Sequence, residues 1–115
     1  MAVTIYHRPQ CSTSRAALEL ICSRGIEPTI VLYAKTGWTQ TQLASLFEAM
    51  KVTPRDMLRV KGTPAQDLGL TDPAVSDARI LAAMVENPIL VERPIVTSSK
   101  GAVLARPVER VLDIL

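Results

Sequence analysis

The chain has 115 residues, of which 48% are hydrophobic and 3% aromatic, and its formal net charge is +2 at pH 7. This length fits one domain with an aliphatic core, and so small a charge gives no reason to expect nucleic acid or an acidic membrane surface as a partner. No apolar run approaches the ~20 residues of a membrane span, and the N-terminus lacks the pattern of a signal peptide. We therefore expect a cytoplasmic protein with no membrane partner, whose thiols stay reduced.

The first part of the sequence predicts a strand, a helix and a second strand. Residues 2–6 form a short apolar run that alternates like a strand, and residues 14–22 favour a helix that ends at Gly25. Residues 29–33 are β-branched and almost continuously apolar, which predicts a fully buried strand. Two strands joined by a helix within about 33 residues form a parallel βαβ unit.

The middle of the sequence predicts further helices. Thr39 caps one helix, and Pro54 begins a short helix that continues through Leu58. Residues 59–71 contain two glycines and a proline, and are expected to form a loop with at most one short helix. Ser76 caps a last helix of this region, which ends at Pro88. The expected buried positions of the two longer helices are Leu43, Leu46, Phe47 and Met50, and Ile80, Leu81, Met84 and Val85.

The C-terminal part predicts an antiparallel hairpin and a helix. Residues 95–97 and 103–104 are apolar runs joined by a turn, and Pro107 begins a helix that reaches Leu115. The order βαβ, helical insertion at about 38–90, ββ, α is that of a thioredoxin-like α/β fold with a small mixed sheet. We expect residues 1–115 to form a single domain of this fold. Pro94, just before the third strand, would then lie beside the start of the first helix.

Cys11 stands between the first predicted strand and the first predicted helix. Backbone N–H groups and the positive end of the helix dipole converge at such a position, where they favour a thiolate and can bind an anion. Arg8 and Arg15 add positive charge. Helix N-termini with basic neighbours lower the pKa of cysteine from about 8.5 to roughly 3.5–7.5. We interpret Cys11 as the reactive centre.

A structural interpretation of the same residues remains open. A lone cysteine is often a small buried apolar side chain, and the hydroxyls of Ser12, Thr13 and Ser14 would suit an ordinary helix cap as well as an oxyanion site. Cys22 is the only other cysteine. An intervening helix would separate the two by roughly 16 Å, whereas a disulfide needs Cα atoms within about 7 Å. Because Cys22 falls at helical spacing with Leu18 and Ile21, we expect it to pack in the core.

Several separated segments together carry a family resemblance. They are Tyr6-His7-Arg8-Pro9-Gln10-Cys11 with Ser14-Arg15, Glu27-Pro28-Thr29 leading to Val31-Leu32-Tyr33, Met57-Leu58-Arg59, Asn87-Pro88-Ile89-Leu90 through Arg93-Pro94-Ile95-Val96, Arg106-Pro107, and Val111-Leu112-Asp113-Ile114-Leu115. With these motifs in this order, the chain resembles the glutaredoxin-dependent arsenate reductases over nearly its whole length.

The resemblance implies roles for six residues. The cysteine that matches Cys11 attacks arsenate, and the arginines that match Arg59, Arg93 and Arg106 bind its oxygens. The residue that matches His7 lies near the sulfur and helps to lower its pKa, and the one that matches Ser14 hydrogen-bonds the sulfur. Planar guanidinium groups suit such an oxyanion, which carries up to two negative charges.

The resemblance also implies the co-substrates. Glutathione would join the arsenic on Cys11, and glutaredoxin would then release arsenite, with no tightly bound cofactor or metal. Two sequence features favour external thiols. Ser14 stands where a Cys-x-x-Cys motif would need its second cysteine, and Ala17 stands where a Cys-x5-Arg loop would need its arginine.

Some residues depart from the detoxifying members of the family. Ser12 replaces a glycine, Arg8 replaces an asparagine, and the sequence stops at a segment that those members continue past. These traits resemble a short, arsenate reductase-like branch. Two other functions are compatible with the fold: a monothiol thiol–disulfide oxidoreductase, and a regulator that binds RNA polymerase. Ser14 argues against the Cys-x-x-Cys redox switch that many such regulators carry.

Overall fold

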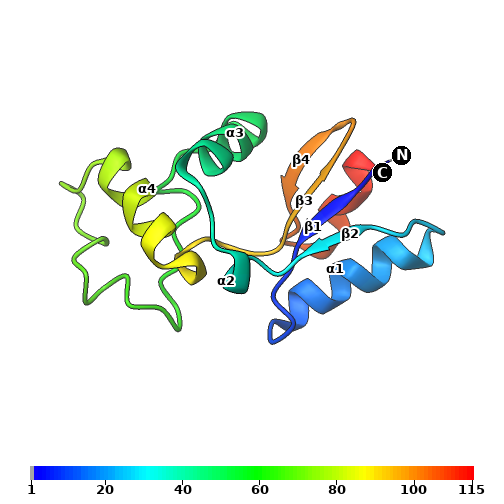
Figure 1. Ribbon diagram of the computed structural model, residues 1–115, viewed down its shortest axis with the longest axis horizontal. Coiled ribbons are helices and arrows are strands. Elements are labelled where there is room, and N and C mark those ends of the chain that lie inside the picture. The colour runs from blue at the N-terminus through cyan, green and yellow to red at the C-terminus, as the bar shows by residue number, and fades with distance from the viewer. Residues whose placement is uncertain (1) are drawn as a thin grey trace. The chain divides into compact units, whose positions relative to one another are not determined.

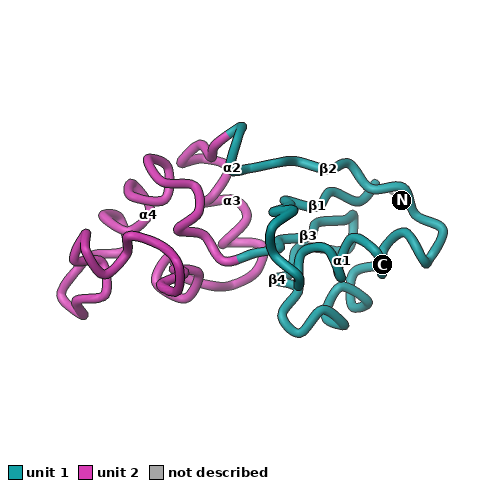
Figure 2. Tube along the Cα trace, turned by 90° about the horizontal axis from the view of Figure 1, so that it is seen from below, with its two compact units in different colours: residues 1–36, 93–115 teal, residues 37–92 magenta. Residues whose placement is uncertain are grey.

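The structure is a computed structural model that describes residues 2–115. The chain divides into two compact units, which Figure 2 colours teal and magenta. We call residues 1–36 with 93–115 the sheet unit, and residues 37–92 the helical unit. None of the helices within residues 2–115 has the length and apolar character that crossing a membrane requires.

The sheet unit contains a four-stranded mixed sheet with the strand order β2-β1-β3-β4 (Figure 1). Strand β1 (Thr4–Tyr6) pairs in parallel with β2 (Thr29–Val31) and antiparallel with β3 (Ile95–Ser98). Strand β4 (Gly101–Leu104) completes an antiparallel hairpin with β3. The predicted thioredoxin-like α/β fold, its βαβ unit and its hairpin are confirmed.

Three helices accompany this sheet: α1 (Ser12–Ser23), the short α2 (Tyr33–Thr36) and the 3₁₀ helix η2 (Val108–Ile114). Ala17 and Ile21 of α1 are buried together with Val111 and Ile114 of η2. The rest of this core comes from the sheet and the segments next to it: Val3, Ile5, Val96, Val103 and Ala105. The core thus fixes α1, and the cysteine before it, against the sheet.

Three expectations for the sheet unit need correction. The strand predicted over residues 29–33 ends at Val31 and is not fully buried, because β2 is an edge strand with a neighbour on one side only. Ile30 is 48% exposed, and Tyr33 already begins α2.

Cys22 is exposed, because the buried positions of α1 end with Ile21 and the next residue turns about 100° away. The last helix is a 3₁₀ helix, in which Val111 and Ile114 recur every three residues on the buried side.

The helical unit is built around α3 (Gln40–Met50) and α4 (Asp77–Glu86). Thr39 and Gln42 form a capping box at α3, and Ser76 caps α4 by accepting a hydrogen bond from the Arg79 N–H. Both caps are where the sequence predicted them. The buried positions are Leu43, Leu46 and Phe47 in α3, and Ile80, Ala83 and Met84 in α4, whereas Met50, Leu81 and Val85 are only half-buried.

The short helix predicted from Pro54 to Leu58 is a series of turns. Leu58 leaves the turn to pair with Val91 in an antiparallel bridge, just after the 3₁₀ helix η1 (Pro88–Leu90). Backbone hydrogen bonds on either side of this bridge bring Arg59 and Glu92 together. The Arg59 N–H donates to the Leu90 carbonyl at 2.7 Å, and the Glu92 N–H donates to the Met57 carbonyl at 2.8 Å. The backbone therefore holds Arg59 and Glu92 as neighbours.

Candidate active site

Cys11 lies in the loop that leads from β1 to α1. It is the N-cap residue of α1, in an extended conformation, and its own N–H donates to the Arg8 carbonyl at 2.9 Å. Its thiol is free and only 8% of the residue is exposed. The first N–H groups of α1 therefore point toward a sulfur that is largely shielded from water.

The β3–β4 hairpin brings Arg93 and Arg106 to this cysteine. Arg93 comes two residues before Ile95, and Arg106 comes two residues after Leu104. Ile95 and Leu104 face each other across the two strands, so both arginines lie at the same end of the hairpin. Ile95 in turn pairs with Tyr6 at the end of β1. The loop that carries Cys11 therefore leaves the sheet at the same end of the strands as the two arginines. The peptide bonds that follow the two arginines, to Pro94 and to Pro107, are both cis.

Arg106 is fixed by two hydrogen bonds. Its Nε donates to the Arg93 carbonyl at 2.6 Å, and its Nη2 donates to the Cys11 Sγ at 3.3 Å. The Arg93 side chain acts on the same sulfur and lowers the pKa of Cys11. Two guanidinium groups thus converge on one sulfur atom.

These contacts lower the pKa of the Cys11 thiol. Burial acts in the opposite direction and raises it, because a thiolate loses hydration inside the protein. The N–H groups of Ser14 and Thr13, the Arg93 side chain and the charge of Arg106 lower the pKa and together outweigh burial. The resulting pKa lies below the ordinary value, which favours the thiolate.

His7 and Ser14 form a buried pair behind the cysteine. The Ser14 hydroxyl lies 2.6 Å from the His7 Nδ1, and it accepts a hydrogen bond from the Arg8 N–H at 3.0 Å. Burial, and then the charge of Arg15, lower the pKa of His7, so its ring is neutral near pH 7. A neutral ring adds no positive charge beside the sulfur. The backbone N–H of Ser14 helps to lower the pKa of Cys11, while its hydroxyl holds the loop.

Arg59, the third arginine of the predicted oxyanion site, belongs to the helical unit. Its Nη1 pairs with the Glu92 carboxylate at 3.0 Å, and its side chain is 16% exposed. Its role as a further oxyanion ligand remains a prediction from the resemblance.

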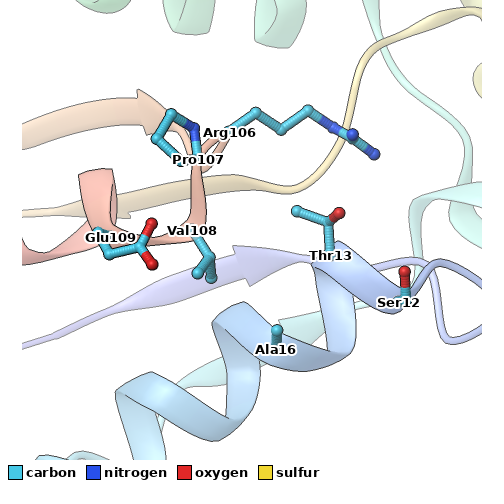
Figure 3. Close-up of a pocket in the computed structure, with 7 residues that line it drawn as sticks. All are labelled: Ser12, Thr13, Ala16, Arg106, Pro107, Val108 and Glu109. Carbon is cyan, nitrogen blue, oxygen red and sulfur yellow. The ribbon is translucent and has the colours of Figure 1, made fainter.

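A shallow groove of about 490 Å³ opens beside the cysteine, wholly within the sheet unit. Ser12, Thr13 and Ala16 of α1 form one wall, and residues 106–109 form the other (Figure 3). Pro94, expected beside the helix start, is buried. Sequence reasoning singled out Ser12 and Thr13 but missed Ala16 and Glu109, because nothing in their local sequence shows that they face the same groove.

A thioredoxin-like sheet, with a cysteine of lowered pKa at a helix start and two arginines beside it, is typical of proteins that use a reactive thiol. The comparisons with known proteins identify the family. The model of the ArsC family matches residues 6–114, so the chain belongs to that family. A Synechocystis protein named arsenate reductase ArsI2 is 52% identical over 98% of this chain and 81% of its own length. An arsenate reductase of Rhizobium meliloti is 50% identical over 100% of this chain and 82% of its own length. The structure of an arsenate reductase from Vibrio cholerae matches with a TM-score of 0.95 at 40% identity, covering 100% of this chain and 98% of that one.

Proposed function

We propose that this protein reduces arsenate to arsenite, with Cys11 as the nucleophile and with glutathione and glutaredoxin as the sources of electrons. The observation that carries the proposal is the convergence of Arg93 and Arg106 on the Cys11 sulfur. The names of the similar proteins from Synechocystis and Rhizobium meliloti support arsenate as the substrate. The reaction requires a reduced thiol, which fits the cytoplasm.

Arsenate binding rests on the two arginines next to the sulfur. Guanidinium groups donate paired hydrogen bonds in one plane, which match the oxygens of a tetrahedral oxyanion. The Nε of Arg93 is buried and makes no hydrogen bond within residues 2–115, so this donor is available to a substrate oxygen. Arg59 has the same property at its Nε, which makes it a candidate third ligand.

The first chemical step is a substitution at arsenic. The Cys11 thiolate forms a sulfur–arsenic bond. A hydroxide leaves the arsenic on the side opposite the sulfur and takes up a proton to become water. Arsenic stays in the +5 state. The arginines stabilise the negative charge on the arsenic oxygens through this step.

The second stage supplies two electrons. The glutathione thiolate displaces another hydroxide and becomes bound to the same arsenic, again without oxidation or reduction. A glutaredoxin thiolate then attacks the glutathione sulfur; a disulfide forms, and the electron pair of the sulfur–arsenic bond stays on arsenic, which becomes +3. Water finally hydrolyses the bond to Cys11 and releases arsenite. An external thiol is needed because the other cysteine, Cys22, lies at the far end of α1.

The test is a coupled assay with arsenate, glutathione, glutaredoxin, glutathione reductase and NADPH. We expect NADPH consumption that depends on arsenate, that disappears in Cys11→Ser and that persists in Cys22→Ser. Absence of turnover at every arsenate concentration would refute arsenate reduction. A parallel assay with a glutathione mixed disulfide in place of arsenate would then test the monothiol oxidoreductase alternative.

A further inference from the structure

We propose that the groove between α1 and residues 106–109 is the binding site of the small thiol co-substrate, and that Glu109 receives its ammonium group. This inference rests on the proposed function, since it names where glutathione sits when it attacks arsenic on Cys11. The groove, its size and its lining residues carry the argument.

The groove is lined by the neighbours of the reacting cysteine, although Cys11 itself is not part of its lining. Ser12 and Thr13 directly follow Cys11 in the chain, and both line the groove. Arg106, on the opposite wall, is the residue whose Nη2 donates to the Cys11 Sγ. A molecule lying in this groove can therefore bring a thiol to an arsenic atom bonded to Cys11.

The groove is larger than the oxyanion requires. Its volume of about 490 Å³ lies in the range of roughly 300–1,000 Å³ that is typical of sites for small organic ligands. A tetrahedral anion held by Arg106 would fill only the end nearest the sulfur. The remaining length suits a short peptide.

The charges along the groove are opposite at its two ends. Figure 3 shows the Arg106 guanidinium near the start of α1 and the Glu109 carboxylate at the far end of the row, beyond Val108. Glu109 is exposed and forms no ion pair within the described part of the chain, residues 2–115. A carboxylate beside an anion site disfavours a second anion and favours a cation.

Glutathione matches this arrangement. It is a tripeptide with a central thiol, and the ammonium group of its glutamyl residue is its only cation. Placing the thiol at Cys11 directs the ammonium along the groove toward Glu109, while Pro107 and Val108 supply apolar contact in between. The groove is open to solvent, which leaves the glutathione sulfur accessible to a second thiol.

The first experiment measures binding without turnover. S-methylglutathione, which cannot react with arsenic, is titrated into the labelled protein and followed by NMR. We expect shifts of the amide signals of residues 12, 13, 16 and 106–109, and a dissociation constant about tenfold higher in Glu109→Lys, where attraction becomes repulsion. Glu27→Lys is the matched control: it makes the same charge change at an exposed loop residue that does not line the groove. Shifts confined to other residues, or equal affinities in wild type and Glu109→Lys, would overturn the proposal.

The second experiment measures steady-state kinetics. Glu109→Lys is expected to raise the KM for glutathione about tenfold, with the KM for arsenate unchanged. Ala16→Phe, which fills the groove from α1, should have the same effect, whereas Ala44→Phe, on an exposed face of α3, should not. If arsenate is turned over and the glutathione KM of Glu109→Lys is normal, the groove assignment is wrong while the proposed function stands. If arsenate is never reduced but the NMR titration gives the expected result, the groove assignment stands and the proposed function is wrong.

Discussion

The Nη2 of Arg106 lies 3.3 Å from the Sγ of Cys11, although 95 residues separate the two in the sequence. The same guanidinium donates through its Nε to the Arg93 carbonyl. The bond from Nε therefore orients the Arg106 guanidinium, and its Nη2 donates to the sulfur. This arrangement links the stability of the Cys11 thiolate to the end of the β3–β4 hairpin.

Removing Arg106 should raise the pKa of Cys11. Because positive charge and donated hydrogen bonds favour the thiolate, Arg106→Ala and Arg93→Ala should each shift the midpoint of iodoacetamide alkylation to higher pH. The measurement is made in a Cys22→Ser background, so that only Cys11 reacts. Arg110→Ala is the control, since it removes the same charge at an exposed position of the sheet unit. A wild-type midpoint above 8.5 would contradict the activated thiolate itself.

Arsenate binding should depend on the same two arginines. Each contributes charge-assisted hydrogen bonds worth about 1.5–3 kcal/mol, so alanine at either position should raise the KM for arsenate by roughly 10- to 100-fold or abolish turnover. Arg106→Lys should recover part of the loss, because it keeps the charge but not the paired donors. Normal arsenate kinetics in both alanine variants, with the fold intact by circular dichroism, would remove them from the site.

Ser14 should be important for stability as well as for the active-site loop. Ser14→Ala leaves the buried His7 Nδ1 and the Arg8 N–H without their shared hydroxyl, which should lower the free energy of unfolding by about 1–3 kcal/mol. Ser23→Ala, at the exposed end of the same helix, should cost less than about 0.5 kcal/mol. Urea denaturation measures both, and equal effects of the two substitutions would contradict the role of the buried pair.

His7 should make stability depend on pH. The pKa of His7 is lowered in the folded protein, so the unfolded chain binds a proton more readily. The contribution of the neutral ring to the free energy of unfolding is therefore complete above about pH 6.5, and it is lost as the pH falls toward the folded pKa. The difference in unfolding free energy between wild type and His7→Gln should therefore shrink from pH 7 to pH 5. A difference that does not change over this range would show that His7 does not fold as a buried neutral ring.

Local patterns in the sequence predicted the parts of the site that are local. Arg93 and Arg106, which the fold brings to Cys11, followed only from the family resemblance. Cys11 was found from the strand, loop and helix around it, and the caps at Thr39 and Ser76 from their side chains. The exposure of Ile30 and Cys22 was missed, because neither an edge position nor a shift of one residue around a helix changes a local apolar pattern. Glu109 was missed because only the hairpin register carries its segment back to α1.

The ion pair between Arg59 and Glu92 should stabilise the helical unit and restrain Arg59. Because both side chains are mostly shielded from water, we expect a coupling energy of about 1 kcal/mol from a double-mutant cycle of Arg59→Gln, Glu92→Gln and their combination, measured by urea denaturation. The kinetics of the same variants separate structure from function. If Arg59 also binds arsenate, Arg59→Gln raises the KM for arsenate, while Glu92→Gln, which frees the guanidinium from its carboxylate, leaves that KM unchanged or lowers it. If both variants raise the KM equally, Arg59 acts only through the ion pair, and Arg93 and Arg106 bind the oxyanion without it.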